Sequence, residues 1–138
     1  MKVPFTGKCL CGDIKYTVSK EPLGMGHCHC RDCQIVSSTS HTSVVAVHAD
    51  SIKWDTGEPK EFINVADSGT KVVRHFCPKC GTHLTGYSEA TKDFVGIKAA
   101  TMDDVESFKP TIDSYISSTP SWTVMSNETQ KFDYGIGQ

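Results

Sequence analysis

Seven cysteines in a chain of 138 residues are the side chains best able to do chemistry. They fall into three tight groups, spaced Cys9-x-Cys11, Cys28-x-Cys30-x2-Cys33 and Cys77-x2-Cys80. An odd number of cysteines cannot all pair within one chain, and thiols at such spacing are typical of metal ligands. Disulfides and separate core cysteines are the alternatives, but core cysteines have no reason to cluster in this way. The spacing therefore predicts metal sites.

The seven thiols divide most naturally into four and three. Zinc takes four tetrahedral ligands in a structural site, and three plus an open position in a reactive one. Cys77 and Cys80, followed by Gly81, are typical of a zinc knuckle. Cys9 and Cys11 would face the same way, because residues i and i+2 of an extended segment point to one side. Together these four predict a structural zinc site that closes a loop of about seventy residues.

The other three sulfurs, of Cys28, Cys30 and Cys33, lie within six residues and predict a second zinc site with one open position. Three thiolates make the metal a weak Lewis acid, so this site suits an incoming thiol, held as its reactive thiolate, better than a hydroxide. A mixed division, with Cys9 and Cys11 joined to Cys28 and Cys30, is an open alternative that leaves Cys33 away from its neighbours.

Three segments of the chain resemble the glutathione-dependent formaldehyde-activating enzymes, a family whose domain is shared with centromere protein V. Residues 7–16, 27–34 and 76–84 resemble its G-x-C-x-C-G, C-H-C-x-x-C-[RQ] and F-C-x-x-C-G-[TS]-x-[LI] motifs. The resemblance implies a tent-like fold of several coiled sheets and the same division of the cysteines. It also implies that glutathione binds at the second zinc and adds to formaldehyde, a reaction classed in reverse as a carbon–sulfur lyase.

The chain departs from the family pattern at two places. Ser37 and Ser38 stand where the family usually has glycine after the three cysteines, and Asp113 aligns where many members have histidine. We expect both places to lie near a substrate pocket, so the departures bear on the identity of the substrate rather than on the metal sites.

Short β-strands are the elements that must hold these residues. Runs rich in β-formers predict strands at 14–18, 43–48, 61–65, 71–76, 94–97 and 115–116. The turn signal Asp67-Ser68-Gly69 makes residues 61–76 a hairpin. Helix signals are confined to 31–36 and to a short turn capped by Thr101, with Asp104 at its third position. The pattern predicts one all-β domain, residues 1–138, of short coiled antiparallel sheets pinned by zinc, with very little helix.

Four further side chains are weaker candidates. His29 lies between two cysteines, but strand alternation turns it away from their sulfurs, so we expect a supporting or surface role. His41 sits on a polar loop from which it could reach a substrate. Arg31 and Arg74 could pair with substrate carboxylates, although an exposed arginine is usually a solvated surface charge.

Composition narrows the classes of function. The net charge of −2 argues against nucleic acid as a partner, and no apolar run is long enough to cross a membrane. The first residues contain no apolar secretion signal, so we expect a cytoplasmic protein. The resemblance implies that it acts on a small thiol and an aldehyde. A non-catalytic zinc module that binds a protein or nucleic acid is the main alternative. A thiol–disulfide redox protein would need a βαβ pattern that the chain lacks.

Overall fold

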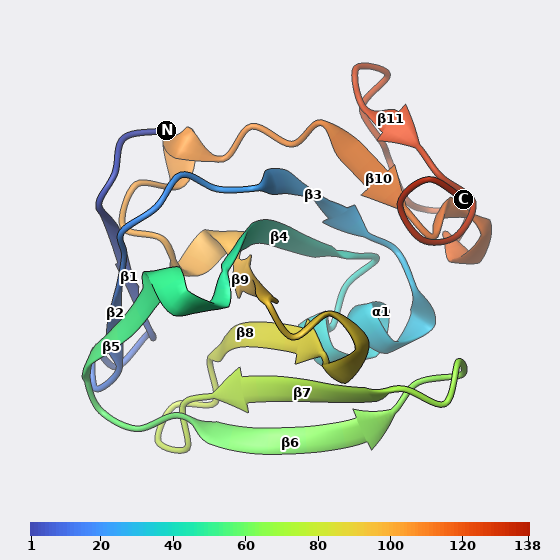
Figure 1. Ribbon diagram of the computed structural model, residues 1–138. Helices are drawn as coiled ribbons and strands as arrows, with labels where there is room; N and C mark the ends of the chain where they lie inside the picture. Colours follow the sequence, from blue (N-terminus) through green and yellow to red (C-terminus); the bar gives the residue numbers. More distant parts are fainter.

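The computed structural model describes all 138 residues, and two β-sheets form most of it (Figure 1). The strands are β1 Phe5–Lys8, β2 Lys15–Val18, β3 Gly24–Cys28, β4 Thr42–His48, β5 Ile52–Thr56, β6 Lys60–Val65, β7 Lys71–Phe76, β8 His83–Ser88, β9 Phe94–Lys98, β10 Ile112–Ser114 and β11 Gln130–Lys131. The helical segments are α1 Arg31–Ser37 and the short 3-10 turns η1 Ala49–Ser51, η2 Glu89–Thr91, η3 Ala99–Thr101, η4 Val105–Ser107 and η5 Ile116–Ser118. The all-β class, with one short α-helix at the expected place, is confirmed.

A small and a large sheet divide the strands between them. The small sheet has the order β1-β2-β5, and the large one the order β11-β10-β3-β4-β9-β8-β7-β6. In Figure 1 the small sheet lies at one side of the molecule, with the β6–β7 hairpin and the C-terminal strands at opposite edges of the large sheet. Strand β10 runs parallel to both β3 and β11, so the large sheet is mixed rather than purely antiparallel. Residues 115–129 supply the long connection that parallel pairing of β10 with β11 requires.

The core lies between one face of the large sheet and the small sheet. Val45 and Val47 of β4 and Ile97 of β9 are fully buried and pack with Tyr16 and Val18 of β2. Because side chains alternate along a strand, the residues between them point to the other side of the large sheet. We call that side the open face.

The hairpin is confirmed, whereas two local predictions are wrong. Strands β6 and β7 pair in register, and Gly69 adopts a φ of 86° in the turn between them. Tyr115 is not in a strand, because its left-handed backbone (φ 56°) ends the sheet and leads into η5. Thr101 is not a helix cap either: Asp104 caps η4, accepting a hydrogen bond from the amide of Glu106 at 3.2 Å.

Strand β3 escaped the sequence prediction because its residues, Gly-Met-Gly-His-Cys, include no β-branched side chain. Its glycines serve a close approach. A Cβ atom at Gly26 would lie only 2.7 Å from the carbonyl oxygen of Ile112 on the parallel neighbour β10. The glycines lower the intrinsic β-propensity of the strand, but they allow β10 to pack close beside it.

None of the helical segments is long and apolar enough to span a lipid bilayer.

Candidate metal centres

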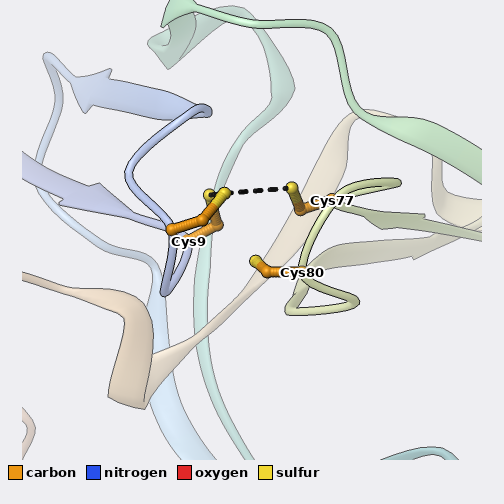
Figure 2. Close-up of side chains that lie close together, drawn as sticks. Cys9, Cys77 and Cys80 are labelled. Atoms are coloured by element: carbon orange, nitrogen blue, oxygen red, sulfur yellow. Dashed lines mark hydrogen bonds between the residues drawn. The ribbon is translucent and has the colours of Figure 1, made fainter.

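Four sulfurs from distant parts of the chain meet at one end of the molecule. Cys9 and Cys11 approach from the turn after β1, while Cys77 and Cys80 lie in the turn after β7, and Figure 2 shows the side chains of both turns pointing toward one another. We call this the four-cysteine cluster. Its sulfurs all lie within 4.8 Å of one another. The sulfur of Cys11 is 3.6 Å from that of Cys9 and 3.8 Å from that of Cys77. A tetrahedral zinc site with Zn–S bonds of about 2.3 Å has sulfurs about 3.8 Å apart, so the spacing fits that ion.

Backbone hydrogen bonds hold the two turns of the four-cysteine cluster in place. The amide of Ile14 donates a hydrogen bond to the sulfur of Cys9 at 3.3 Å. Such a bond stabilises the thiolate form of that sulfur. The amide of Leu10 donates to the hydroxyl of Thr82 at 3.1 Å and so joins the first turn to the second. Gly81 has the left-handed backbone (φ 77°) that the knuckle turn needs.

The other three sulfurs form a separate group, the three-cysteine cluster. Cys28 ends β3, Cys30 is the N-cap of α1, and Cys33 lies in its first turn, with all three sulfurs within 4.8 Å of one another. The amide of Cys33 donates to the sulfur of Cys30 at 3.4 Å. Hydrogen bonds from Cys30 and Cys33 lower the pKa of Cys28 to about 3, while the same contacts raise the pKa of Cys33. One thiolate is thus stabilised even before any cation arrives.

The structure groups the sulfurs as four and three, and no cluster mixes the two sets. All seven cysteines are free, so no disulfide competes for them. Both clusters offer only cysteine sulfurs, all within 4.8 Å of one another in each cluster, and this donor set is typical of zinc.

His29 is neither a surface residue nor one of the clustered ligands. Its side chain is only 1% exposed, and its Nε2 lies 2.6 Å from Oδ1 of Asp113. The Thr129 hydroxyl also donates to Asp113. Burial raises the pKa of Asp113, but hydrogen bonds from His29 and Thr129 outweigh it, so the pKa lies below its usual range. Asp113 is therefore a buried anchor between β10 and the segment carrying the cysteines. The Asp113 side chain itself is buried rather than open to a cavity, while its neighbours Ile112 and Ser114 line one.

A cleft of 510 Å³ opens beside α1 and the knuckle turn, and we call it the cationic cleft. Its charged or titratable lining residues are Lys8, His41, His83 and Lys98, and no carboxylate lines it. Ser37 lines the cleft too, so that departure from the family pattern does face a cavity. Burial lowers the pKa of both histidines, to about 4 for His83, so both rings are neutral at pH 7. The lysines are the charged groups here, and they suit an anionic ligand.

Lys98 connects the cationic cleft to the three-cysteine cluster. Lys98 of β9 pairs with Val44 of β4, and Val44 pairs in turn with Gly26 of β3. Because Cys28 lies two residues after Gly26 on the same strand, Lys98 and Cys28 share the open face. Burial lowers the pKa of Lys98, and negative charge on Cys33 opposes that shift. This lysine was not among the residues predicted from the sequence. Its signal was the alternation along β9, where Lys98 falls out of phase with the core residues Val95 and Ile97.

The two arginines differ. Arg74, on the open face of β7, is only 7% exposed and donates to Oδ1 of Asn64, so it is not the solvated surface charge that its residue type favours. Arg31 is exposed and donates to Oε1 of Gln34 at 3.2 Å.

Comparison with known proteins gives a family and a solved structure of similar fold. A family model described as glutathione-dependent formaldehyde-activating enzyme matches residues 4–118. Among solved structures, a protein of Rhodobacter sphaeroides from a structural genomics programme is similar, with a TM-score of 0.57, 17% identity, and 72% of this chain and 88% of that chain covered. At that identity the likeness concerns the fold alone. Comparison with curated proteins gives no match.

Proposed function

The chain belongs to the glutathione-dependent formaldehyde-activating enzyme family, and on that premise we propose that it is a zinc enzyme that adds a small thiol to an aldehyde. The observation that carries the proposal is the three-cysteine cluster. It is a compact set of sulfurs, separate from a complete four-sulfur set, and a cationic cleft lies beside it. We propose further that residues 1–138 form one zinc-binding domain, since both clusters and the family match fall within it.

The two clusters would hold one Zn²⁺ ion each. The four-cysteine cluster, with Cys9 and Cys77 buried, has its four ligands supplied by the protein and fits a structural ion. Cys28, Cys30 and Cys33 supply three ligands and so leave one position for an outside donor. An ion bound there would supply positive charge that keeps the sulfur of an incoming thiol deprotonated, and thiolate is the reactive form.

The cationic cleft suits glutathione as that thiol. Glutathione carries two carboxylates, and the cleft presents Lys8 and Lys98 with no carboxylate to repel them. Lys98 is half-buried and makes no salt bridge within the protein, so its amino group is free to pair with a carboxylate of a ligand. His41 lines the same cleft and could donate a hydrogen bond to the bound molecule.

The reaction consists of one addition. The thiolate sulfur attacks the carbonyl carbon, a C–S bond forms, and the π bond of the carbonyl breaks. The oxygen takes up the proton that the thiol gave up, so atoms and charge balance without an oxidant or reductant. With formaldehyde and glutathione the product is S-hydroxymethylglutathione, and its breakdown is the carbon–sulfur lyase direction.

The test combines metal analysis with kinetics. We expect two zinc ions per chain, and faster exchange between ¹³C-formaldehyde and its glutathione adduct in NMR spectra when the protein is present. Cys30→Ser should keep one zinc and the fold but lose the rate enhancement. Lys98→Gln should raise the KM for glutathione about tenfold while leaving that for uncharged 2-mercaptoethanol nearly unchanged, because a charge-assisted contact is worth about 1.5–3 kcal/mol.

Two results would count against the proposal. One is a second zinc whose X-ray absorption spectrum shows four protein ligands and no change on adding glutathione. The other is full zinc occupancy with no acceleration for any thiol and aldehyde pair, which would leave a non-catalytic zinc module.

A further inference from the structure

A second cavity on the open face also reaches the three-cysteine cluster, and nothing in the proposed reaction of formaldehyde uses it. It has a volume of 480 Å³, and we call it the apolar groove. Eight of its twelve lining residues are hydrophobic, among them Leu23, Val44, Phe94, Ile112 and Ile136. Cys28 lines the groove as well. A groove of this size is within the range of small-molecule sites, and it is far larger than formaldehyde needs.

The register of the strands explains how the groove reaches the cluster. Gly24 and Gly26 of β3 pair with Ala46 and Val44 of β4, and they share the open face with Cys28. Gly24 has open space where a Cβ would stand, and Ala46 beside it carries only a methyl group, so the surface of the sheet is hollow at this end. At Gly26 the backbone of Ile112 comes close, so β10 forms a wall of the groove there. From Cys28 back to Gly24 the strand covers about 13 Å at about 3.3 Å per residue. The groove is therefore long enough for an octyl chain, with a sulfur of the cluster at one end.

The chemistry of the groove differs from that of the cationic cleft. Apart from the thiol of Cys28, which is one of the eight hydrophobic residues, its polar side chains are limited to His27 and Ser114, and it contains no lysine, arginine or carboxylate. A charged thiol such as glutathione would lose its hydration in the groove without gaining a partner. The two cavities beside the three-cysteine cluster thus suit an anionic thiol and an apolar molecule respectively.

Resting on the proposed function, we propose that the apolar groove holds the hydrocarbon chain of the carbonyl substrate, so that the protein acts on straight-chain alkyl aldehydes. The aldehyde carbon lies at the Cys28 end of the groove. There the thiolate sulfur of the incoming thiol substrate, not that of Cys28, forms a C–S bond with it. The π bond of the carbonyl breaks, the oxygen takes the proton released by the thiol, and a hemithioacetal results. The alkyl chain extends toward Gly24, Phe94 and Ile136.

The prediction for wild-type protein is a rise of kcat/KM with chain length. Each methylene buried is worth about 0.8 kcal/mol, which corresponds to about a fourfold rise per carbon. We expect this rise from propanal to octanal and a plateau once the chain passes the end of the groove. Initial rates with glutathione and each aldehyde, measured by NMR, give the series.

Two variants test the position of the chain. Ala46→Leu fills the far end of the groove, four residues along the sheet from the Thr42–Cys28 pair, and should cut kcat/KM for octanal at least tenfold and that for propanal much less. Phe94→Ala, at a side chain that is 46% exposed, should lower the rate for octanal without a cost in folding. Ala90→Leu is the matched control, since Ala90 is exposed on η2 and lines neither cavity.

Binding of 1-octanol, which cannot react, separates this inference from the proposed function. We expect chemical-shift changes at Gly24, Ala46 and Ile112 on adding octanol, and about tenfold weaker binding to Ala46→Leu. If formaldehyde is turned over but the chain-length series is flat and octanol does not bind, the inference is overturned and the proposed function stands. If octanol binds in the groove but no aldehyde reacts, the proposed function fails and the assignment of the groove to a carbonyl substrate fails with it.

Discussion

Replacing Asp113 by alanine should lower the free energy of unfolding more than replacing any other single carboxylate. Asp113 is 1% exposed and accepts hydrogen bonds from His29 and Thr129, which are themselves buried. Asp113→Ala removes both bonds and leaves His29 Nε2 unpaired, while the Thr129 hydroxyl keeps only its bond to the carbonyl of Ser126. At about 1.5 kcal/mol for each hydrogen bond to a charged group, the free energy of unfolding should fall by about 3 kcal/mol. For a domain of this size that corresponds to a fall in Tm of about 12 °C.

The assay is urea unfolding of wild type and variant, followed by circular dichroism. Asp133→Ala is the control, because Asp133 is exposed in the same C-terminal segment and its carboxylate bonds to nothing; it should change stability by less than about 0.5 kcal/mol. Since the pKa of Asp113 is lowered by folding, its contribution is present above about pH 4 and disappears as the pH falls through the lower folded value. The gap between wild type and Asp113→Ala should therefore narrow in acid.

A loss below about 1 kcal/mol at pH 7 would refute the reasoning, because the buried hydrogen bonds would then contribute nothing beyond what water provides. Equal losses for Asp113→Ala and Asp133→Ala would do the same. Asp113→Asn should lie between wild type and Asp113→Ala, since its amide oxygen can still accept from His29 but carries no charge.

Three further predictions concern other parts of the fold. Gly26→Ala should cost about 2 kcal/mol or more in urea unfolding, because its Cβ would press on the backbone of β10, whereas Gly24→Ala on the same strand has nothing within 4 Å and should be nearly neutral. Burial of His83 lowers its pKa to about 4, so between about pH 6.5 and 4 only the unfolded chain takes up a proton there, and the free energy of unfolding should fall as the pH falls through this range. His83→Gln should make that fall smaller by on the order of 1 kcal/mol, measured by urea unfolding at a series of pH values. Cys77→Ser should lower the zinc content from two ions to one and lower the Tm by more than Cys30→Ser does, because Cys77 is fully buried where the two turns meet; equal effects would contradict a purely structural role for the four-cysteine cluster.

The cysteine spacing predicted the most about the site. C-x-C and C-x2-C are local signatures, so the three tight groups were evident from the sequence. The number of ligands that zinc takes favoured joining Cys9 and Cys11 to Cys77 and Cys80, but the mixed division stayed open until the structure grouped the sulfurs as four and three. The hairpin at residues 60–76 was predictable for the same reason, since its turn and both strands are contiguous.

Features that depend on pairing between distant segments could not be predicted. Asp113 gives no local sign that it meets His29, because the contact exists only once β10 lies parallel to β3. The glycines of β3 argue against a strand until the carbonyl of Ile112 is placed beside them. The two cavities arise in the same way, since each takes its lining from segments far apart in the sequence.

The contrast between one local and one long-range sulfur cluster has a consequence during synthesis of the chain. Cys28, Cys30 and Cys33 leave the ribosome almost together, so they could capture an ion while most of the protein is still unmade. Cys9 and Cys11 emerge earlier, yet their partners follow only after some seventy more residues have been added. Cys9 and Cys11 are therefore synthesised first but meet their partner cysteines last. Until then, these two thiols are the ones most exposed to oxidation or to binding the wrong metal.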